Sequence, residues 1–296
     1  MSGESNSSLT LAAPCKVNLT LDVFPPRADG YHDLDSLVVP FATPADHVTV
    51  TLRPGSAAIT LIAKHAPSDF PKGPENLAYR AAALYREKYG IDGRIFIKLD
   101  KRLPMQAGLG GGSSDAASVL LALHQLTGAS ATASLTELAA TLGSDVPLFL
   151  SQAPVRMRGR GEIVEALPAP LPALWGVIAR PAVGVPTGPA YSALDSMTDR
   201  TPGTATTRLL DALQSSADVH TIAPLLSNDF EQAIFPAYPE VAEAYRMIVE
   251  AGALRALLCG SGSALFGLAE NRDHARDLVK ALVGRIPWVK LAATTL

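Results

Sequence analysis

The stretch PMQAGLGGGSSDAA, residues 104–117, places three consecutive glycines and two serines directly before an apolar segment. The residues that follow, to position 127, carry apolar side chains at the three- and four-residue spacing of a helix. The stretch is preceded by RIFIKL, residues 94–99, whose composition predicts a strand. We therefore expect a glycine-rich loop between a strand and a helix that begins near Ser113 or Ser114.

This loop is suited to holding an anion. The first turn of a helix leaves backbone N–H groups unpaired and carries a partial positive charge, and glycines let a phosphate approach the backbone. A glycine turn capped by serine is the simpler alternative. The loop is not a Walker A motif, because no Lys-Ser or Lys-Thr pair follows the glycines. It is a poor dinucleotide fingerprint, because the acid about 20 residues later, Glu137, lies within a predicted helix.

The composition indicates a globular protein. The chain has 296 residues, 48% hydrophobic and 18% charged, with a net charge of −3. This length allows one large or two ordinary domains, and the charge gives no reason to expect nucleic acid as a partner. Two cysteines, Cys15 and Cys259, make neither a disulfide framework nor a metal site of usual spacing. With no signal-like N-terminus and no span of about 18 apolar residues, we expect a cytoplasmic protein that does not enter the membrane.

The rest of the chain mixes strands and helices without strict alternation, which predicts an α+β fold. Strands are predicted at 9–23 and 174–180, a hairpin at 48–52 and 58–62, and a second hairpin around GSGS within 255–269. Helices are predicted at 75–90, 135–143, 238–252 and 272–284, and a proline-rich connection at 166–174.

Three separated stretches carry a resemblance to a known family. APCKVNLTLDV (13–23), the glycine-rich loop and LCGSGSALFGLA (258–269) resemble, in this order, the three motifs of the GHMP family of small-molecule kinases. RADGYH (27–32) and LGSDVP (142–147) make the resemblance closer to members that act on a cytidine diphosphate-linked methylerythritol. It implies an N-terminal GHMP kinase domain at 1–155, with the ATP phosphate loop and the catalytic residues. A C-terminal domain at 156–296 would carry the substrate side, with the active site in the interdomain cleft.

The resemblance also implies the reaction. The γ-phosphoryl group of ATP would pass to the 2-hydroxyl of this small-molecule substrate, in a step of non-mevalonate isoprenoid biosynthesis. Mg²⁺ is expected together with ATP, and its protein ligands are unknown. Neither nucleic acid nor a membrane is an expected partner, and the chain would be a monomer or a weak homodimer.

Two residues are implied to be catalytic, Lys16 and Asp145. Taken alone, Lys16 is typical of a solvent-facing strand lysine, and Asp145 of a residue near a helix N-cap with Pro147 just inside. In the family, the matching Asp takes the proton of the attacking hydroxyl. The matching Lys lies beside that hydroxyl, where it would stabilise the negative charge of the transition state.

For ATP, the resemblance implies contacts from the loop and from two residues outside it. Asn76 and Lys101 match positions near the adenine or ribose, although by themselves they are a helix-start residue and a charged turn residue. The loop residues that would wrap the phosphates are Pro104, Met105, Gln106, Ala107, Gly108, Leu109, Gly110, Gly111, Gly112, Ser113 and Ser114.

For the acceptor, Tyr31 would stack on the cytosine, His32 would bond its polar edge, and Tyr191 would supply a second ring. Without the resemblance, Tyr191 is as typical of a side chain in the hydrophobic core of the second domain as of a substrate-binding ring. Four further residues would contact the substrate: Asn18, Thr187, and Gly260 and Ser261 of the late turn. That late turn is also compatible with a plain hairpin.

Three alternatives remain open from the sequence. The same fold would serve another acceptor, such as homoserine, mevalonate, phosphomevalonate or a sugar. A catalytically silent member would bind nucleotide or sugar as a sensor, against which the presence of both Lys16 and Asp145 argues. A dinucleotide-binding oxidoreductase is disfavoured by the misplaced acid.

Overall fold

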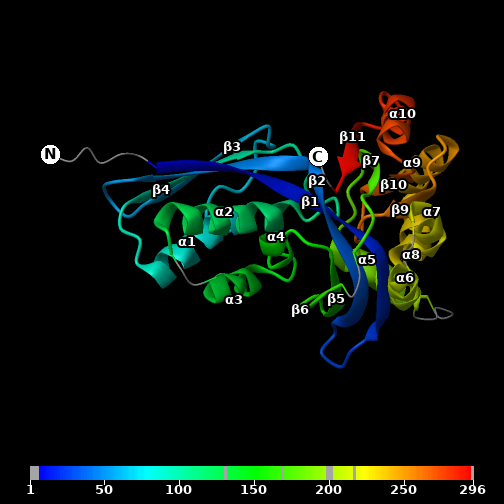
Figure 1. The fold of residues 1–296 in the computed structure, drawn as a ribbon, viewed down its shortest axis with the longest axis horizontal. Helices are drawn as coiled ribbons and strands as arrows, with labels where there is room; N and C mark the ends of the chain where they lie inside the picture. The colour runs from blue at the N-terminus through cyan, green and yellow to red at the C-terminus, as the bar shows by residue number, and fades with distance from the viewer. Residues whose placement is uncertain (1–6, 130–131, 168–169, 198–202, 216–217, 295–296) are drawn as a thin grey trace. The chain divides into compact units, whose positions relative to one another are not determined.

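The computed structural model describes residues 7–129, 132–167, 170–197, 203–215 and 218–294, and the chain divides into two compact units (Figure 1). The first unit comprises Met1–Cys15, Ala45–Leu103 and Gly110–Gln152. The second comprises Lys16–Pro44, Pro104–Leu109 and Ala153–Leu296. Both units are discontinuous, because the strands β1 (Ser7–Pro26) and β2 (His32–Arg53) each run from one unit into the other. A division of family domains after residue 155 stays a prediction.

The first unit places helices on one face of a sheet (Figure 1). Its further elements are β3 (Ile59–Lys64), α1 (Leu77–Tyr89), β4 (Arg94–Asp100), α2 (Gly111–Thr127), α3 (Thr132–Leu142) and α4 (Leu148–Ser151). β4 alternates strictly, with Ile95, Ile97 and Leu99 fully buried, because one face of the strand packs on the core. Helices α1, α2 and α3 pack on one another, and α4 packs on α2.

The second unit contains the remaining elements. Its strands are β5 (Val155–Gly159), β6 (Ile163–Ala166), β7 (Trp175–Arg180), β8 (Ser227–Asn228), β9 (Arg255–Leu258), β10 (Leu265–Ala269) and β11 (Trp288–Ala293). Its helices are α5 (Thr187–Asp195), α6 (Ala205–Gln214), α7 (Val219–Ile222), the 3₁₀ turn η1 (Ala223–Leu225), α8 (Phe230–Ala237), α9 (Pro239–Glu250) and α10 (Arg272–Leu282).

Antiparallel pairing builds most of the sheet in this second unit. β7 lies between β11 and β10, and β10 pairs in turn with β9. The start of β2 pairs with β5, and the two-residue strand β8 runs parallel to β1. One hydrophobic core joins β1, β7, β9 and β10 to helices α5, α8, α9 and α10. The late hairpin and the end of β1, at Leu21 and Val23, are therefore anchored to the same core.

The α+β class is confirmed, and so are the strand at 9–23, the main predicted helices and the hairpin of β9 and β10. The hairpin predicted at 48–62 is wrong, because β4 lies between β2 and β3 and pairs with both. The helix after the glycine loop begins at Gly111, two residues earlier than predicted. β11 was not predicted, and the proline-rich stretch 166–174 includes two residues, 168–169, outside the described ones.

Candidate active site

The glycine-rich loop is shaped by left-handed backbone conformations. Gln106, Gly108 and Gly110 have φ values of 50°, 77° and 71°, and Gly110 is the N-cap of α2 without a side-chain cap. Glycine adopts this conformation at little cost, whereas other residues rarely do. The first-turn amides that a helix leaves without internal partners belong to Gly111, Gly112 and Ser113. The loop thus ends in a set of N–H groups suited to an anion.

Two of the glycines differ in what the fold requires of them. A Cβ at Gly108 would lie 1.8 Å from the carbonyl oxygen of Cys259, so only glycine fits there. Gly112 is exposed and helical, and a Cβ would come no closer than 3.9 Å to a described atom, Cδ1 of Leu77. The packing of the fold gives no reason for glycine at position 112, so the requirement would come from a bound group.

Three stretches far apart in sequence meet within the second unit. The backbone N–H of Lys16 donates to the carbonyl of Leu109 at 2.9 Å, and that of Ala264 donates to Ala107 at 3.2 Å. A Cβ at Gly260 would lie 3.4 Å from Nζ of Lys16. The β1 lysine, the first half of the glycine loop and the late turn are therefore in direct contact, as the resemblance implies for the three motifs.

Lys16 is not the solvent-facing lysine that its alternating strand suggests. Its exposed fraction is 7%, and its ammonium donates to Oδ1 of Asn18 at 2.7 Å. Asn18 lies two residues along β1, on the same side of the strand, and its amide nitrogen donates to Oγ of Ser36 at 2.9 Å. A buried ammonium with an oriented amide beside it can bind and polarise an anionic or polyol group.

The late turn is held by a residue that the sequence did not single out. The buried amide nitrogen of Asn228 donates to the carbonyls of Leu258 and Gly260, at 2.8 and 2.7 Å. Its amide oxygen accepts the N–H of Phe230 at 3.0 Å. The bond to Phe230 is local, but the two bonds to Leu258 and Gly260 join positions 30 and 32 residues apart, which no local sequence pattern predicts. Asn228 thus fixes the conformation of the turn that adjoins Lys16.

Neither cysteine is suited to catalysis. Both are fully buried. Burial raises the pKa of Cys259 to about 12, with the Lys16 ammonium opposing that rise, so its thiol stays protonated at neutral pH.

Lys101 lies in a buried ion cluster of the first unit. Its ammonium donates to carboxylates of Asp46 and Asp115, and Asp46 also accepts the N–H of Leu103 at 2.8 Å. Burial opposes the charge on Lys101, but the two carboxylates outweigh it and raise its pKa. Burial raises the pKa of Asp115 to about 7, against the effect of Lys101. The cluster fixes the start of the glycine loop, and contact of Lys101 with a nucleotide stays a prediction.

Asn76 is the N-cap of α1, as its position suggested. Its Oδ1 accepts the N–H of Ala78 at 2.8 Å, and its Nδ2 donates to the carbonyl of Pro71. The side chain is buried, so its structural role is clear. Any contact with ATP stays a prediction.

Among the described residues, no group of three or more His, Cys, Asp or Glu side chains is arranged to hold a metal ion. One buried atom nevertheless stands out at the start of α2. The hydroxyl of Ser114 is fully buried and has no hydrogen-bond partner within the described part of the chain. Buried hydroxyls without a partner are rare in proteins unless a ligand or a water binds them, so Ser114 fits a role toward a bound ion or phosphate.

Asp145 lies in the turn between α3 and α4, half-buried, in the first unit. The N-cap of the helix that follows is Pro147, so Asp145 lies near the cap as expected, and Pro147 is the cap itself rather than a residue just inside the helix. A turn closed by the N–H of Val146 and the carbonyl of Gly143 comes before the helix begins. Lys16 belongs to the second unit, and a meeting of Asp145 with Lys16 stays a prediction.

The predicted base-binding residues line one pocket of the second unit, about 370 Å³ in volume. Tyr31 is 56% exposed and the Arg160 guanidinium lies over its ring at 4.8 Å. The ring of His32 stacks on that of Tyr191, with centroids 4.8 Å apart. The pocket is lined by Gly30, Tyr31, His32, Leu34, Arg160, Thr187, Gly188, Tyr191, Ser192 and Asp195.

Both ring nitrogens of His32 already have protein partners. Nδ1 lies 2.8 Å from the carbonyl of Phe24, so it donates there, and Nε2 lies 3.3 Å from Oδ2 of Asp195. Thr187 begins α5, and its hydroxyl lies 3.3 Å from that of Ser261 in the late turn. The aromatic pocket and the late turn are thus linked directly within one unit.

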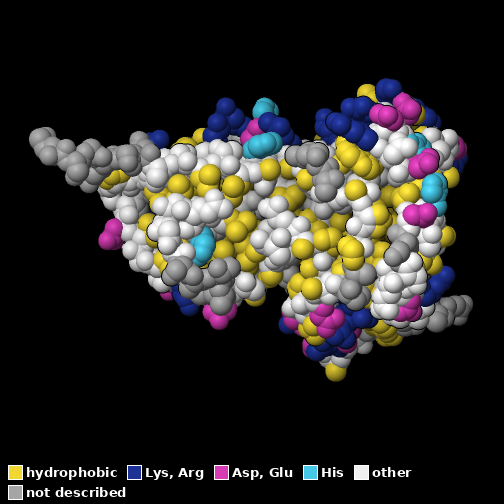
Figure 2. Space-filling view, viewed as in Figure 1, with side chains coloured by type: hydrophobic (Ala, Val, Ile, Leu, Met, Phe, Trp, Pro, Cys, Tyr) yellow, Lys and Arg dark blue, Asp and Glu magenta, His cyan; other side chains and the backbone are white. Residues whose placement is uncertain are grey.

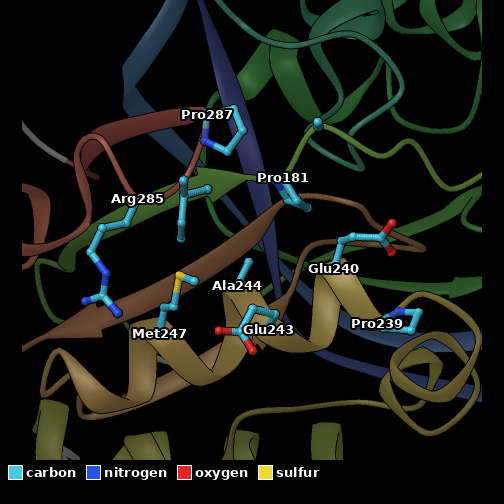
Figure 3. A pocket seen from close by; sticks show the side chains of 10 residues that line it. Pro181, Pro239, Glu240, Glu243, Ala244, Met247, Arg285 and Pro287 are labelled. Atoms are coloured by element: carbon cyan, nitrogen blue, oxygen red, sulfur yellow. The ribbon is translucent and has the colours of Figure 1, made fainter.

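A second pocket of this unit, about 470 Å³, contains none of the predicted site residues (Figure 3). It lies between α9 and the end of β7, and Met247 and Ala244 contribute to its apolar lining. Figure 2 shows Lys or Arg and Asp or Glu side chains gathered at the bottom of the view. On β5 and β6, Arg158 and Glu165 form an ion pair. Neither feature adds chemistry to the site. Among the described residues, no helix has the length and apolar character needed to cross a membrane.

Comparison with known proteins gives consistent matches. The GHMP kinases N terminal domain model matches residues 76–152, and the GHMP kinases C terminal model matches residues 209–285. The chain is similar to 4-diphosphocytidyl-2-C-methyl-D-erythritol kinase of Symbiobacterium thermophilum, with 39% identity covering 93% of this chain and 96% of the relative. The protein of the same name from Thermus thermophilus is 43% identical, covering 91% of each chain.

A solved structure supports the same relationship. The crystal structure of a 4-(cytidine 5'-diphospho)-2C-methyl-D-erythritol kinase superimposes with a TM-score of 0.81 and 41% sequence identity. The match covers 96% of this chain and 98% of that one.

Proposed function

Since this chain belongs to the GHMP kinase family, we propose that it phosphorylates the 2-hydroxyl of 4-diphosphocytidyl-2-C-methyl-D-erythritol, with ATP as donor. The products are ADP and the 2-phosphate, in a step of the non-mevalonate isoprenoid pathway. The observation that carries the proposal is the meeting of Lys16, the first half of the glycine loop and the late turn in one unit, beside a pocket lined by aromatic rings. Relatives named for this substrate match more than nine-tenths of the chain.

ATP binds through the loop 104–114. Its phosphates accept from the first-turn amides of α2, and the exposed Gly112 leaves room for their close approach. The buried hydroxyl of Ser114, which has no partner among the described residues, assists Mg²⁺ or a phosphate oxygen. Mg²⁺ supplies neutralisation of the phosphate charge when bound with ATP.

The transfer requires Lys16, of the second unit, and Asp145, of the first, to act on the same acceptor hydroxyl. Asp145 accepts the hydroxyl proton as the phosphoryl group moves. Because the transition state of phosphoryl transfer is loose, this proton leaves late, and positioning matters more than the strength of the base. Lys16 donates to the negative charge that develops on the transferred group, and Asn18 orients it.

The cytidine end of the substrate binds in the aromatic pocket. Tyr31 stacks on the base, where Arg160 already covers one ring face. The ring of His32 stacks on Tyr191, and both nitrogens of the His32 ring already have protein partners. The two rings therefore form one wall of the pocket, and their side chains shift slightly when the base binds. Thr187, Gly260 and Ser261 lie between this pocket and Lys16, on the route that the diphosphate would take.

The cellular setting follows from the proposed reaction. The substrate and ATP are charged metabolites, so we place the enzyme in the cytoplasm, as a monomer or weak homodimer. The family domains divide near residue 155, with the loop and Asp145 before that point and the pocket wall at Tyr191 after it.

The deciding experiment incubates the protein with ATP, Mg²⁺ and 4-diphosphocytidyl-2-C-methyl-D-erythritol and identifies the product by phosphorus NMR. A new phosphomonoester signal on the methylerythritol part, with equimolar ADP, is expected. Homoserine, mevalonate, phosphomevalonate and a sugar run in parallel, and turnover with one of these alone would reassign the acceptor. The absence of ADP release with every acceptor would favour a nucleotide sensor, and NADH binding would favour an oxidoreductase.

The Asp145→Asn variant tests the base. It keeps the shape of the side chain but cannot accept the proton, so kcat is expected to fall by about 10²- to 10⁴-fold. The Kd for ATP, measured by calorimetry, should stay within about twofold. Wild-type turnover in this variant would remove Asp145 from the chemistry.

A further inference from the structure

We propose that Ser36 is a positioning residue for this reaction, whose hydroxyl dictates which end of the Asn18 amide faces Lys16. The inference rests on the proposed function, in which Lys16 and Asn18 act at the acceptor hydroxyl. Ser36 lies on β2, two residues after Leu34 of the aromatic pocket, and its exposed fraction is 2%.

The hydroxyl proton of Ser36 is already used in a hydrogen bond to the backbone. Oγ of Ser36 lies 2.6 Å from the backbone carbonyl of Thr20, and a carbonyl can only accept. A serine hydroxyl has a single proton, so this bond uses it. Toward its remaining neighbour, Ser36 therefore presents lone pairs and acts only as an acceptor.

That neighbour is the amide of Asn18, 2.9 Å away. Because Ser36 can only accept, the amide must turn its NH₂ group toward Ser36. The amide oxygen then faces the ammonium of Lys16, at 2.7 Å. The reversed amide would set its oxygen against the lone pairs of Ser36 and its NH₂ group against the ammonium. Both contacts would be repulsive, in a site where all three side chains are buried.

The Ser36 hydroxyl is itself held by the pairing of β1 with β2. The side-chain hydroxyl of Thr20 accepts the N–H of Leu37 at 3.0 Å, so the carbonyl and the side chain of Thr20 bind consecutive residues of β2. The hydroxyl of Thr206, on α6, lies 2.9 Å from that of Thr20 and fixes it from the other side. The direction of the Asn18 amide is therefore set by the backbone of the sheet, several bonds away from Lys16.

The consequence is an oriented ammonium. One N–H of Lys16 points at the Asn18 oxygen, which sets the rotation of the other two about the Cε–Nζ bond. In Ser36→Ala, the amide of Asn18 loses the partner that distinguishes its two ends, so a fraction of molecules would place NH₂ beside the ammonium. Turnover should then fall while ATP binding, which depends on the loop, is unchanged.

The test is a double-mutant cycle read by steady-state kinetics with ATP and the cytidyl diphosphate acceptor. Ser36→Ala is expected to lower kcat by about 5- to 10-fold, the effect of one buried hydrogen bond, with the KM for ATP within about twofold. In the Asn18→Ala background the same substitution should change kcat by less than about twofold, since the amide that it acts through is absent. Ser36→Thr, which keeps the hydroxyl, should restore most of the activity. Should Ser36→Ala fail to fold, Ser36→Cys takes its place, because a thiol is a weaker acceptor.

Thr141→Ala is the matched control. It removes a hydroxyl that donates to the carbonyl of Leu138 at 2.8 Å on α3, and it should leave kcat unchanged. An equal loss of kcat from Ser36→Ala in the wild-type and Asn18→Ala backgrounds would overturn the proposal, because the loss would then be a general effect on the fold.

An activity-free measurement separates this inference from the proposed function. The side-chain NH₂ group of Asn18 should exchange slowly with solvent in the wild type and at least about tenfold faster in Ser36→Ala, by ¹⁵N NMR. If the wild type shows no turnover with any acceptor, the proposed function fails and the exchange result alone decides the role of Ser36. Unchanged exchange in Ser36→Ala would refute it.

Discussion

Gly112 offers a direct test of the phosphate loop, because the fold and the ligand make opposite demands on it. The residue is exposed, has helical conformation, and would place a Cβ 3.9 Å from its nearest described neighbour. Alanine is favoured over glycine within helices by about 1 kcal/mol, somewhat less in the first turn. In a chain of this size that corresponds to a rise in Tm of about 1–4 °C. Gly112→Ala should therefore be more stable than the wild type.

The same methyl group would stand where the phosphates approach the first turn of α2. The loss of one charge-assisted hydrogen bond from an amide to phosphate costs about 1.5–3 kcal/mol, so ATP should bind about 10- to 100-fold more weakly. Calorimetric titration with ATP and thermal unfolding of the same sample measure both effects.

The matched control is Gly188→Ala in the first turn of α5. Gly188 is also exposed, with no described atom within 4 Å of a Cβ, but it lines the aromatic pocket. This variant should raise the KM for the cytidyl substrate and leave the Kd for ATP unchanged. ATP binding of wild-type strength in Gly112→Ala would refute the phosphate loop and leave the glycines as a simple turn.

Three further predictions concern residues around the site. Tyr31→Ala should raise the KM for the cytidyl substrate by about 5- to 100-fold, the effect of losing one stacking contact, with little change in kcat; a fall in kcat alone would argue against stacking. Asn228→Asp sets a carboxylate against the carbonyls of Leu258 and Gly260, so the free energy of unfolding measured in urea should fall by about 2–4 kcal/mol. A fall of less than about 1 kcal/mol would contradict the role given to the amide. Burial raises the pKa of Asp115 from an ordinary 3.8 to about 7, so folding favours its protonated form. Its contribution to stability is therefore full below about pH 4 and is lost as the pH rises through 7. Asp115→Asn should abolish that dependence, so the difference in stability between variant and wild type should shift in favour of the variant as the pH rises from about 4 to about 8. Parallel stability–pH curves for variant and wild type would show that the carboxyl is ionised throughout.

The sequence by itself determined the local structure of the site. The run of glycines ahead of an apolar repeat predicts a loop entering a helix, because backbone freedom and a 3.6-residue period are properties of neighbouring residues. Asn76 and Gly90 mark the two ends of α1 for the same reason, and the structure confirms both caps. The hairpin of β9 and β10 was predictable because its strands are joined by a short turn.

Only the tertiary structure decided which distant residues meet. β4 enters between β2 and β3, since strand order depends on how whole faces are buried and not on which strands are adjacent in the chain. From the sequence, Lys101 is typical of a charged surface residue. In the structure it is buried and paired with Asp46 and Asp115. Ser36 and Asn228 carry no local signal, because a serine or an asparagine is as typical of a turn as of a buried network. Their roles come from hydrogen bonds to residues far away in the sequence, 18 positions from Ser36 to Asn18 and 32 positions from Asn228 to Gly260. These bonds exist only once the sheet has formed.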